Sequence, residues 1–198
     1  MARKPAEQTV HREEIVRAAA EVFHHKGYRG ATMSDIAATV NLTAGSLYHH
    51  FPSKEELLIA VLDAGMTQII AATQAIVQSD APPADKLRAI ARAHISGIIT
   101  HHHIAVAVIF ESRALLEKPG VRAPYVRQRD TLERLYRQVV EEGIAAGAFR
   151  ALDVGIFVKA FFGALNWVSV WYREDGRLSE REIADEIAKT FLAALTKV

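Results

Sequence analysis

Apolar residues recur at helical spacing along almost the whole chain, and this periodicity limits the fold more than any other feature. The first such segment places Ile15, Ala19, Val22 and Phe23 at positions i, i+4, i+7 and i+8. It ends at Gly27, a residue typical of helix C-termini. Almost no segment alternates as a half-buried strand would. The pattern predicts an all-α fold of about nine helices.

The expected helices begin at residues that can cap backbone N–H groups. Three pairs have the spacing of a capping box: Thr32 with Asp35, Ser53 with Glu56, and Ser179 with Glu182. Thr43 is the expected N-cap of a short helix that ends near Phe51. Further helices are expected over 53–78, about 84–100, 103–117 and 122–147, over 153–172, and from 179 onward, with Pro119-Gly120 as a break.

Composition excludes several classes of protein. Half of the 198 residues are hydrophobic, enough to bury the core of one average domain or two small ones. The absence of cysteine excludes a disulfide scaffold, a thiolate metal site and a cysteine nucleophile, and it suits a reducing cytoplasm. The polar first 20 residues predict no signal peptide, and the longest uncharged run, 93–110, contains four histidines, so no membrane partner is expected. No glycine fingerprint predicts a cofactor.

Residues 32–54 have the pattern of a helix-turn-helix. Two short helices are joined by a three-residue turn, so the second could enter a DNA major groove while the first braces it. The side chains left outside the predicted core suit nucleic acid: Thr32, Thr43, Ser46 and Tyr48 carry hydroxyls, His49, His50 and Lys54 can donate or carry charge, and Ala44 and Gly45 allow close backbone approach. The alternative is an ordinary helix pair in a bundle.

The net charge of +1 argues at first against a nucleic-acid binder. However, no acidic residue lies between Asp35 and Glu55. Several acids elsewhere in the first 58 residues occupy first turns, where they complement the helix dipole. We therefore expect DNA binding whose salt dependence is modest. We also expect the affinity for DNA to rise as His49 and His50 protonate.

The segment from about residue 11 to 60 resembles the TetR family of bacterial repressors. The resemblance rests on Lys26-Gly27-Tyr28, on the run 32–40, on 45–51 (Gly-Ser-Leu-Tyr-His-His-Phe) and on 54–58 (Lys-Glu-Glu-Leu-Leu). It implies a DNA-binding domain over 1–52 and a ligand-binding and dimerisation domain over 53–198. It also implies DNA contacts from Thr32, Thr43, Gly45, Ser46, Tyr48, His49 and Lys54, with Tyr48 and Lys54 on phosphates. A homodimer paired through the last two helices would read a pseudo-palindromic operator.

The C-terminal part is similar to a narrower subgroup, repressors of fatty-acid and steroid-ring catabolism that respond to acyl-CoA thioesters. The matching segments are 101–103, 111–115, 141–150 and 166–172. This resemblance implies a repressor released by a hydrophobic effector. The candidate ligand contacts are Phe110, Arg113, Phe162, Trp167 and Trp171, each of which could also be plain core. The alternative effector is a drug-like or aromatic compound that controls an efflux or stress gene.

Two further patterns carry weaker hypotheses. Gly155, Lys159, Gly163 and Asn166 form a stripe that suits an intersubunit seam or a pocket wall, and we favour the seam. The three histidines at 101–103 diverge by about 100° each on a helix, so we predict no metal site. A histidine-dependent metalloenzyme is the remaining alternative, and no nucleophile elbow or phosphate loop supports an enzyme.

Overall fold

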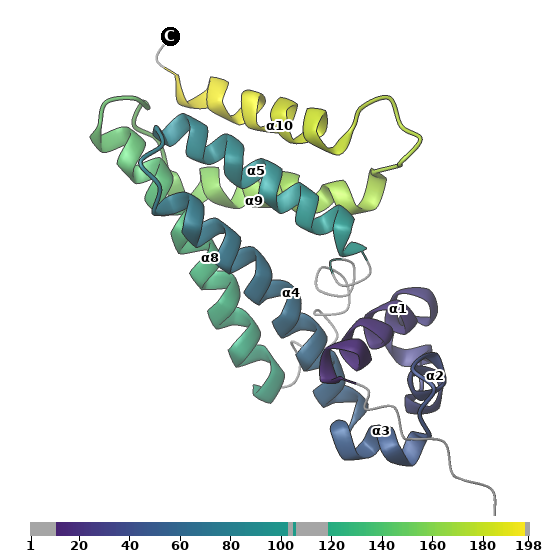
Figure 1. The fold of residues 1–198 in the computed structure, drawn as a ribbon. Coiled ribbons are helices and arrows are strands. Elements are labelled where there is room, and N and C mark those ends of the chain that lie inside the picture. Colours follow the sequence, from purple (N-terminus) through teal and green to yellow (C-terminus); the bar gives the residue numbers. More distant parts are fainter. Residues whose placement is uncertain (1–10, 103–104, 106–118, 197–198) are drawn as a thin grey trace, which may run out of the picture.

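The computed structural model describes residues 11–102, 105 and 119–196, and every regular element in that part of the chain is a helix (Figure 1). The helices are α1 (Arg12–Gly30), α2 (Met33–Thr39), α3 (Ala44–His50), α4 (Lys54–Val77), α5 (Pro83–Thr100), α8 (Pro119–Ala145), α9 (Val154–Trp171) and α10 (Glu180–Leu195). The predicted all-α fold is confirmed. The helix expected over 103–117 lies outside the described residues.

The predicted caps explain where these helices begin. At α2, the hydroxyl of Thr32 accepts a hydrogen bond from the Asp35 backbone N at 3.1 Å, and the Asp35 carboxylate accepts one from the Thr32 N at 3.0 Å. Ser179 and Glu182 form the same reciprocal pair at α10. Such caps satisfy N–H groups that the first helical turn leaves unpaired.

The helices bury two apolar clusters that α4 joins. The first lies among α1, α2, α3 and the start of α4, and it extends along α4 to Leu62. The second lies among α4, α5, α8, α9 and α10, and it begins on α4 at Met66. Figure 1 shows α1, α2 and α3 at one end of α4, with α5, α9 and α10 towards its other end and α8 alongside it. The first cluster therefore continues past the boundary predicted at residue 52.

Two positions bear on the helix boundaries expected from sequence. Gly27 has a φ of +67°, which interrupts α1 at the predicted residue. Helix α8 begins at Pro119, three residues before the start expected at about residue 122, and the residues just before Pro119 lie outside the described part of the chain. A proline is tolerated in the first turn because the N–H it lacks has no partner there anyway.

Candidate functional site

Helices α2 and α3 pack against each other through a small apolar interface. Ile36, Ala37 and Leu47 are buried, and Asn41 turns the chain between the helices with a φ of +55°. Ala37 presents only a methyl group at this contact, so the two helix axes can approach closely. The pair is a helix-turn-helix whose outer side belongs to α3.

The outer side of α3 is polar and open. Tyr48 is 50% exposed, and His49, His50 and Gly45 are exposed beside it. The hydroxyl of Thr43 accepts a hydrogen bond from the Ser46 N at 3.0 Å, so the N-terminus of α3 is capped from within the chain. Among the described residues, a Cβ at position 45 would meet only the Thr43 hydroxyl, at 3.8 Å, so their packing does not require a glycine there.

Two cations hold α3 in place from behind. Arg12 of α1 donates to the His50 carbonyl at 2.9 Å and lies 4.0 Å from the centre of the Phe51 ring. Lys54 donates to the carbonyls of Tyr28 and Ala31, both at 2.7 Å. These bonds tie the C-terminal end of α3 and the start of α4 to α1 and the turn that follows α1, so the outer surface of α3 is held on a fixed support.

An ion pair fixes the start of α2. Lys26 donates to the Asp35 carboxylate at 2.7 Å. This hydrogen bond, followed by those from Thr32, lowers the pKa of Asp35 to about 2. Asp35 therefore stays ionised throughout the neutral range, although it lies close to the candidate DNA surface.

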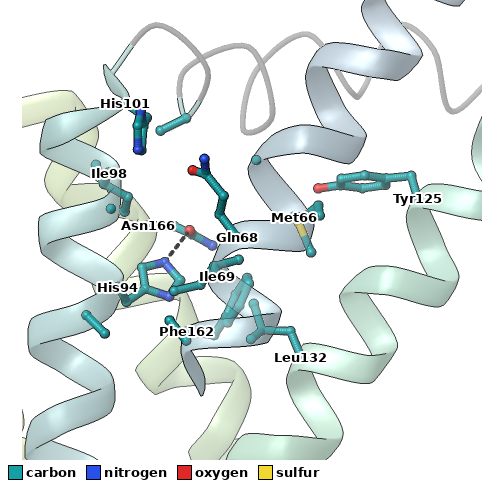
Figure 2. A pocket seen from close by; sticks show the side chains of 15 residues that line it. Met66, Gln68, Ile69, His94, Ile98, His101, Tyr125, Leu132, Phe162 and Asn166 are labelled. Carbon is teal, nitrogen blue, oxygen red and sulfur yellow. Dashed lines mark hydrogen bonds between the residues drawn. The ribbon is translucent and has the colours of Figure 1, made fainter. Parts of the chain in front are cut away.

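A cavity of about 360 Å³ lies among α4, α5, α8 and α9 (Figure 2). Its walls are mostly apolar, with Met66, Ile69, Ile98, Leu132 and Phe162 among them. Leu132 and His94 lie at the buried end, whereas Gln68 and His101 are more exposed. The volume is at the lower end of the roughly 300–1,000 Å³ usual for small-molecule pockets.

A polar network occupies the buried end of this cavity. His94 Nδ1 lies 2.7 Å from the Tyr136 hydroxyl, and His94 Nε2 lies 3.0 Å from Asn166 Oδ1. Burial lowers the pKa of His94 to about 4, so the imidazole is neutral at pH 7. Burial also raises the pKa of Tyr136, which therefore keeps its proton. The phenol can then donate to Nδ1, while Nε2–H donates to Asn166.

A second hollow of about 500 Å³ lies between α8 and α9 and shares the Phe162 side chain with the first. It is rich in cations: Arg129, Arg134, Arg137 and Lys159 line it together with Asp130 and Glu133. Hydrogen bonds from Lys159 and then Arg137 lower the pKa of Glu133. Phe162 thus lines both a mostly apolar cavity and a hollow in which cationic side chains outnumber carboxylates.

Two family models match the chain. Residues 15–61 match "Bacterial regulatory proteins, tetR family", and residues 80–195 match "Tetracyclin repressor-like, C-terminal domain". The second match alone covers more than half of the 198 residues.

The chain belongs to the TetR family.

Relatives within the TetR family align over nearly the full chain. The transcriptional repressor KstR2 of Mycobacterium tuberculosis is 34% identical over 189 residues, which cover 94% of this chain and 93% of that one. A solved structure of the M. tuberculosis KstR2 has a TM-score of 0.85 at 28% identity and covers 99% of this chain and 100% of that one. AibR, solved with isovaleryl coenzyme A and operator DNA, has a TM-score of 0.82 at 28% identity and covers 90% and 96%. These relatives are transcriptional regulators, not enzymes.

The residues expected to contact DNA in a TetR protein fall into two groups. Thr43, Gly45, Tyr48 and His49 lie exposed on or beside α3, and Ala44 and Ser46 are half-buried in its first turn. Thr32 is exposed, but its hydroxyl donates to Asp35 at 2.8 Å. Lys54 is half-buried, and its ammonium is engaged with two carbonyls of α1 and the following turn. The structure thus gives Lys54 a bracing role that the sequence did not indicate.

Of the expected ligand contacts, Phe162 lines the cavity, and Phe110 and Arg113 lie outside the described residues. Trp167 and Trp171 do not line it. They are 58% and 48% exposed, because positions five and nine residues after Phe162 are rotated by about 140° and 180° around α9. The two tryptophans thus lie away from the described cavity, and a ligand contact from either of them stays a prediction.

The four-residue stripe on α9 does not act as one seam. Gly155 lies against Arg137 of α8, and Lys159 pairs with Glu133 at 2.9 Å. Asn166 bonds to His94 in the cavity, whereas Lys159 and Gly163 stay exposed. For most of the stripe the structure supports the pocket-wall interpretation instead of the favoured one.

No group of three potential ligands that could hold a metal occurs among the described residues. Sequence reasoning also missed His94 and Tyr136, which form the polar end of the cavity. A signal for His94 existed, since it lies four residues after Ile90 and four before Ile98, on the apolar face of α5.

Proposed function

We propose that this TetR protein is a homodimeric repressor that leaves its operator when an acyl-CoA thioester enters the α4–α5–α8–α9 cavity. The observation that carries the proposal is the position of α4, which lines this cavity at Met66 and Ile69 and packs under the helix-turn-helix at Leu57 and Leu58. One helix therefore belongs to both the effector pocket and the DNA-binding core, in the cytoplasm where the DNA lies.

The proposed DNA contacts are the exposed surface of α3 and its capped N-terminus. Thr43, Ala44, Gly45 and Ser46 would reach the groove, and Tyr48 and His49 would bond phosphates. A methyl group at position 45 would meet only the Thr43 hydroxyl, at 3.8 Å. Because the described part of the chain leaves this space open, close approach of the DNA is our explanation for a glycine there.

The proposed effector class rests on the cavity and on the names of relatives. One relative is the fatty acid metabolism regulator of Bacillus subtilis, 24% identical over 190 residues, and AibR was solved with isovaleryl coenzyme A. The cavity of about 360 Å³ can take a compact apolar acyl group but not the whole thioester. The neighbouring basic hollow offers Arg134 and Arg137 to an anionic group.

The proposed dimer contact is the outer face of α9. Ile156, Trp167, Val170 and Trp171 are each between 46% and 66% exposed. They lie within about 100° of one helix face, together with the exposed Gly163, which allows close approach. The helix is long and apolar enough to cross a membrane, as is α4. Its inner face packs in the core with α5 and α8, so we assign its outer face to a second copy.

A gel shift on the DNA upstream of the protein's own gene tests the proposal. We expect the chain to bind this DNA and to be released by acyl-CoA thioesters but not by the free acids. Phe162→Asp, which places a charge in the cavity wall, should bind DNA but resist release. Release by drug-like aromatic compounds and not by any thioester would favour the efflux alternative. Retention of the complex at every acyl length would refute the acyl-CoA effector.

A further inference from the structure

Helix α5 forms one wall of the apolar cavity through residues at helical spacing. They are Ala93, His94, Gly97, Ile98 and His101. Figure 2 shows His94 and His101 along α5, with Gln68 and Ile69 of α4 across the space from them. Gly97 lies about one turn from His94 and about one turn from His101, so it occupies the middle of this wall.

Gly97 is a costly residue for a helix. It lies inside α5, and a glycine within a helix is less favourable than an alanine because it loses more backbone freedom on folding. A Cβ built on Gly97 would meet no atom of the described residues within 4 Å. Packing among these residues therefore has room for an alanine, which would make the helix more stable.

The space beside Gly97 belongs to the cavity. Gly97 lines the cavity and has no neighbour within 4 Å among the described residues, so it faces open volume. Protein interiors are usually close-packed, and a void of this kind forfeits contacts that would stabilise the fold. The missing side chain and the void beside it both lower stability, and both are explained if a bound molecule fills the volume.

We propose that Gly97 determines how broad an acyl group the cavity admits. A methyl group at position 97 would narrow the cavity between His94 and His101 without shortening it. A linear chain can pass such a methyl group by rotating about its single bonds, whereas a branched carbon has a fixed width and cannot. This inference rests on the proposed effector function and adds the residue that sets the limit on width.

The test compares hexanoyl-CoA with 3,3-dimethylbutanoyl-CoA, whose acyl groups contain the same number of carbons but differ in width. Calorimetry on the full chain should show that Gly97→Ala weakens binding of the branched thioester at least about tenfold and of the linear one by less than about threefold. The melting temperature of this variant should rise by about 2–4 °C, because alanine favours the helix. Thr100→Ala also favours the helix, at an exposed position outside the cavity wall, and should leave both affinities unchanged.

Equal weakening of the two thioesters in Gly97→Ala, or no weakening of either, would overturn the inference. A fall in the melting temperature would overturn it too, since the methyl group would then not fit where the structure leaves room.

A second measurement separates this inference from the acyl-CoA proposal, which fails if neither thioester binds wild type. In that case NMR of the Ile98 methyl groups is recorded with cyclohexane and with n-hexane. Loss of the cyclohexane response in Gly97→Ala, with the n-hexane response kept, supports the inference. Every other pattern, including no response to cyclohexane in wild type, refutes it.

Discussion

The buried histidine of α5 should make the stability of this protein depend on pH in a defined window. His94 has a pKa of about 4 in the folded chain, because burial disfavours the imidazolium, against an ordinary value of 6.5. Below pH 6.5 the unfolded chain binds a proton that the folded chain refuses, so stability falls as the pH falls from about 6.5 to about 4. Above that window the histidine is neutral in both states and contributes no dependence.

The size of the effect follows from the two pKa values. Treated as one site, His94 costs the folded state about 2 kcal/mol between pH 8 and pH 5, and about 3 kcal/mol by pH 4. His94→Gln can replace both hydrogen bonds but does not titrate. The unfolding free energy of wild type minus that of the variant should therefore fall by about 2 kcal/mol between pH 8 and pH 5, and by about 3 kcal/mol by pH 4.

Urea unfolding at pH 8 and pH 5, at one protein concentration, measures this difference. Using one concentration matters because a dimer's apparent stability depends on it. Other titrating groups act alike in both proteins and cancel in the comparison. A wild-type-minus-variant difference that is the same at both pH values would show that His94 is not held neutral by burial.

Four shorter predictions concern the two proposed interfaces and the N-terminal core. Gly45→Ala should keep the melting temperature and weaken operator binding about tenfold in fluorescence anisotropy, and unchanged binding would contradict close DNA approach. Tyr48→Phe, which removes one hydroxyl, should weaken the same complex by roughly tenfold, and an unaffected complex would exclude a phosphate contact. Asp35 has a lowered pKa, so wild type should lose stability as the pH falls from about 4 to about 2. Over the same pH interval, the melting temperature of Asp35→Asn should fall less than that of wild type. Trp167→Ala should shift the dimer towards monomer in sedimentation velocity, whereas a persistent dimer would place the interface elsewhere.

The helix-turn-helix was predictable from sequence because its information is local. Thr32, Thr43 and Ser179 cap the helices that their spacing indicated, and Gly27 interrupts α1 at the residue where the helix was expected to end. Each of these signals depends on residues within one turn of each other. Local patterns of this kind need no knowledge of the rest of the fold.

The pocket was less predictable because α9 is apolar around most of its circumference. Periodicity cannot show which side of such a helix faces inward, so Trp167 was a candidate as well as Phe162, although of these two only Phe162 lines the cavity. The partners of His94 come from α8 and α9, at 42 and 72 residues' separation. The roles of Lys54 and Asn166 likewise depend on contacts between distant segments.

The sharing of α4 between the two apolar clusters decides where this protein could be cut and joined to another. A fragment that ended at residue 52 would lose Leu57, Leu58, Val61 and Leu62, all of which are buried in the N-terminal cluster. It would also lose Lys54 and its bonds to α1, and would expose Phe51 to water. A chimaera with a different sensor domain should therefore be joined on α4 between Leu62 and Met66, with the helical register kept. The part that should be transferred to another regulator in order to carry over DNA binding is thus the helix-turn-helix together with the first turns of α4.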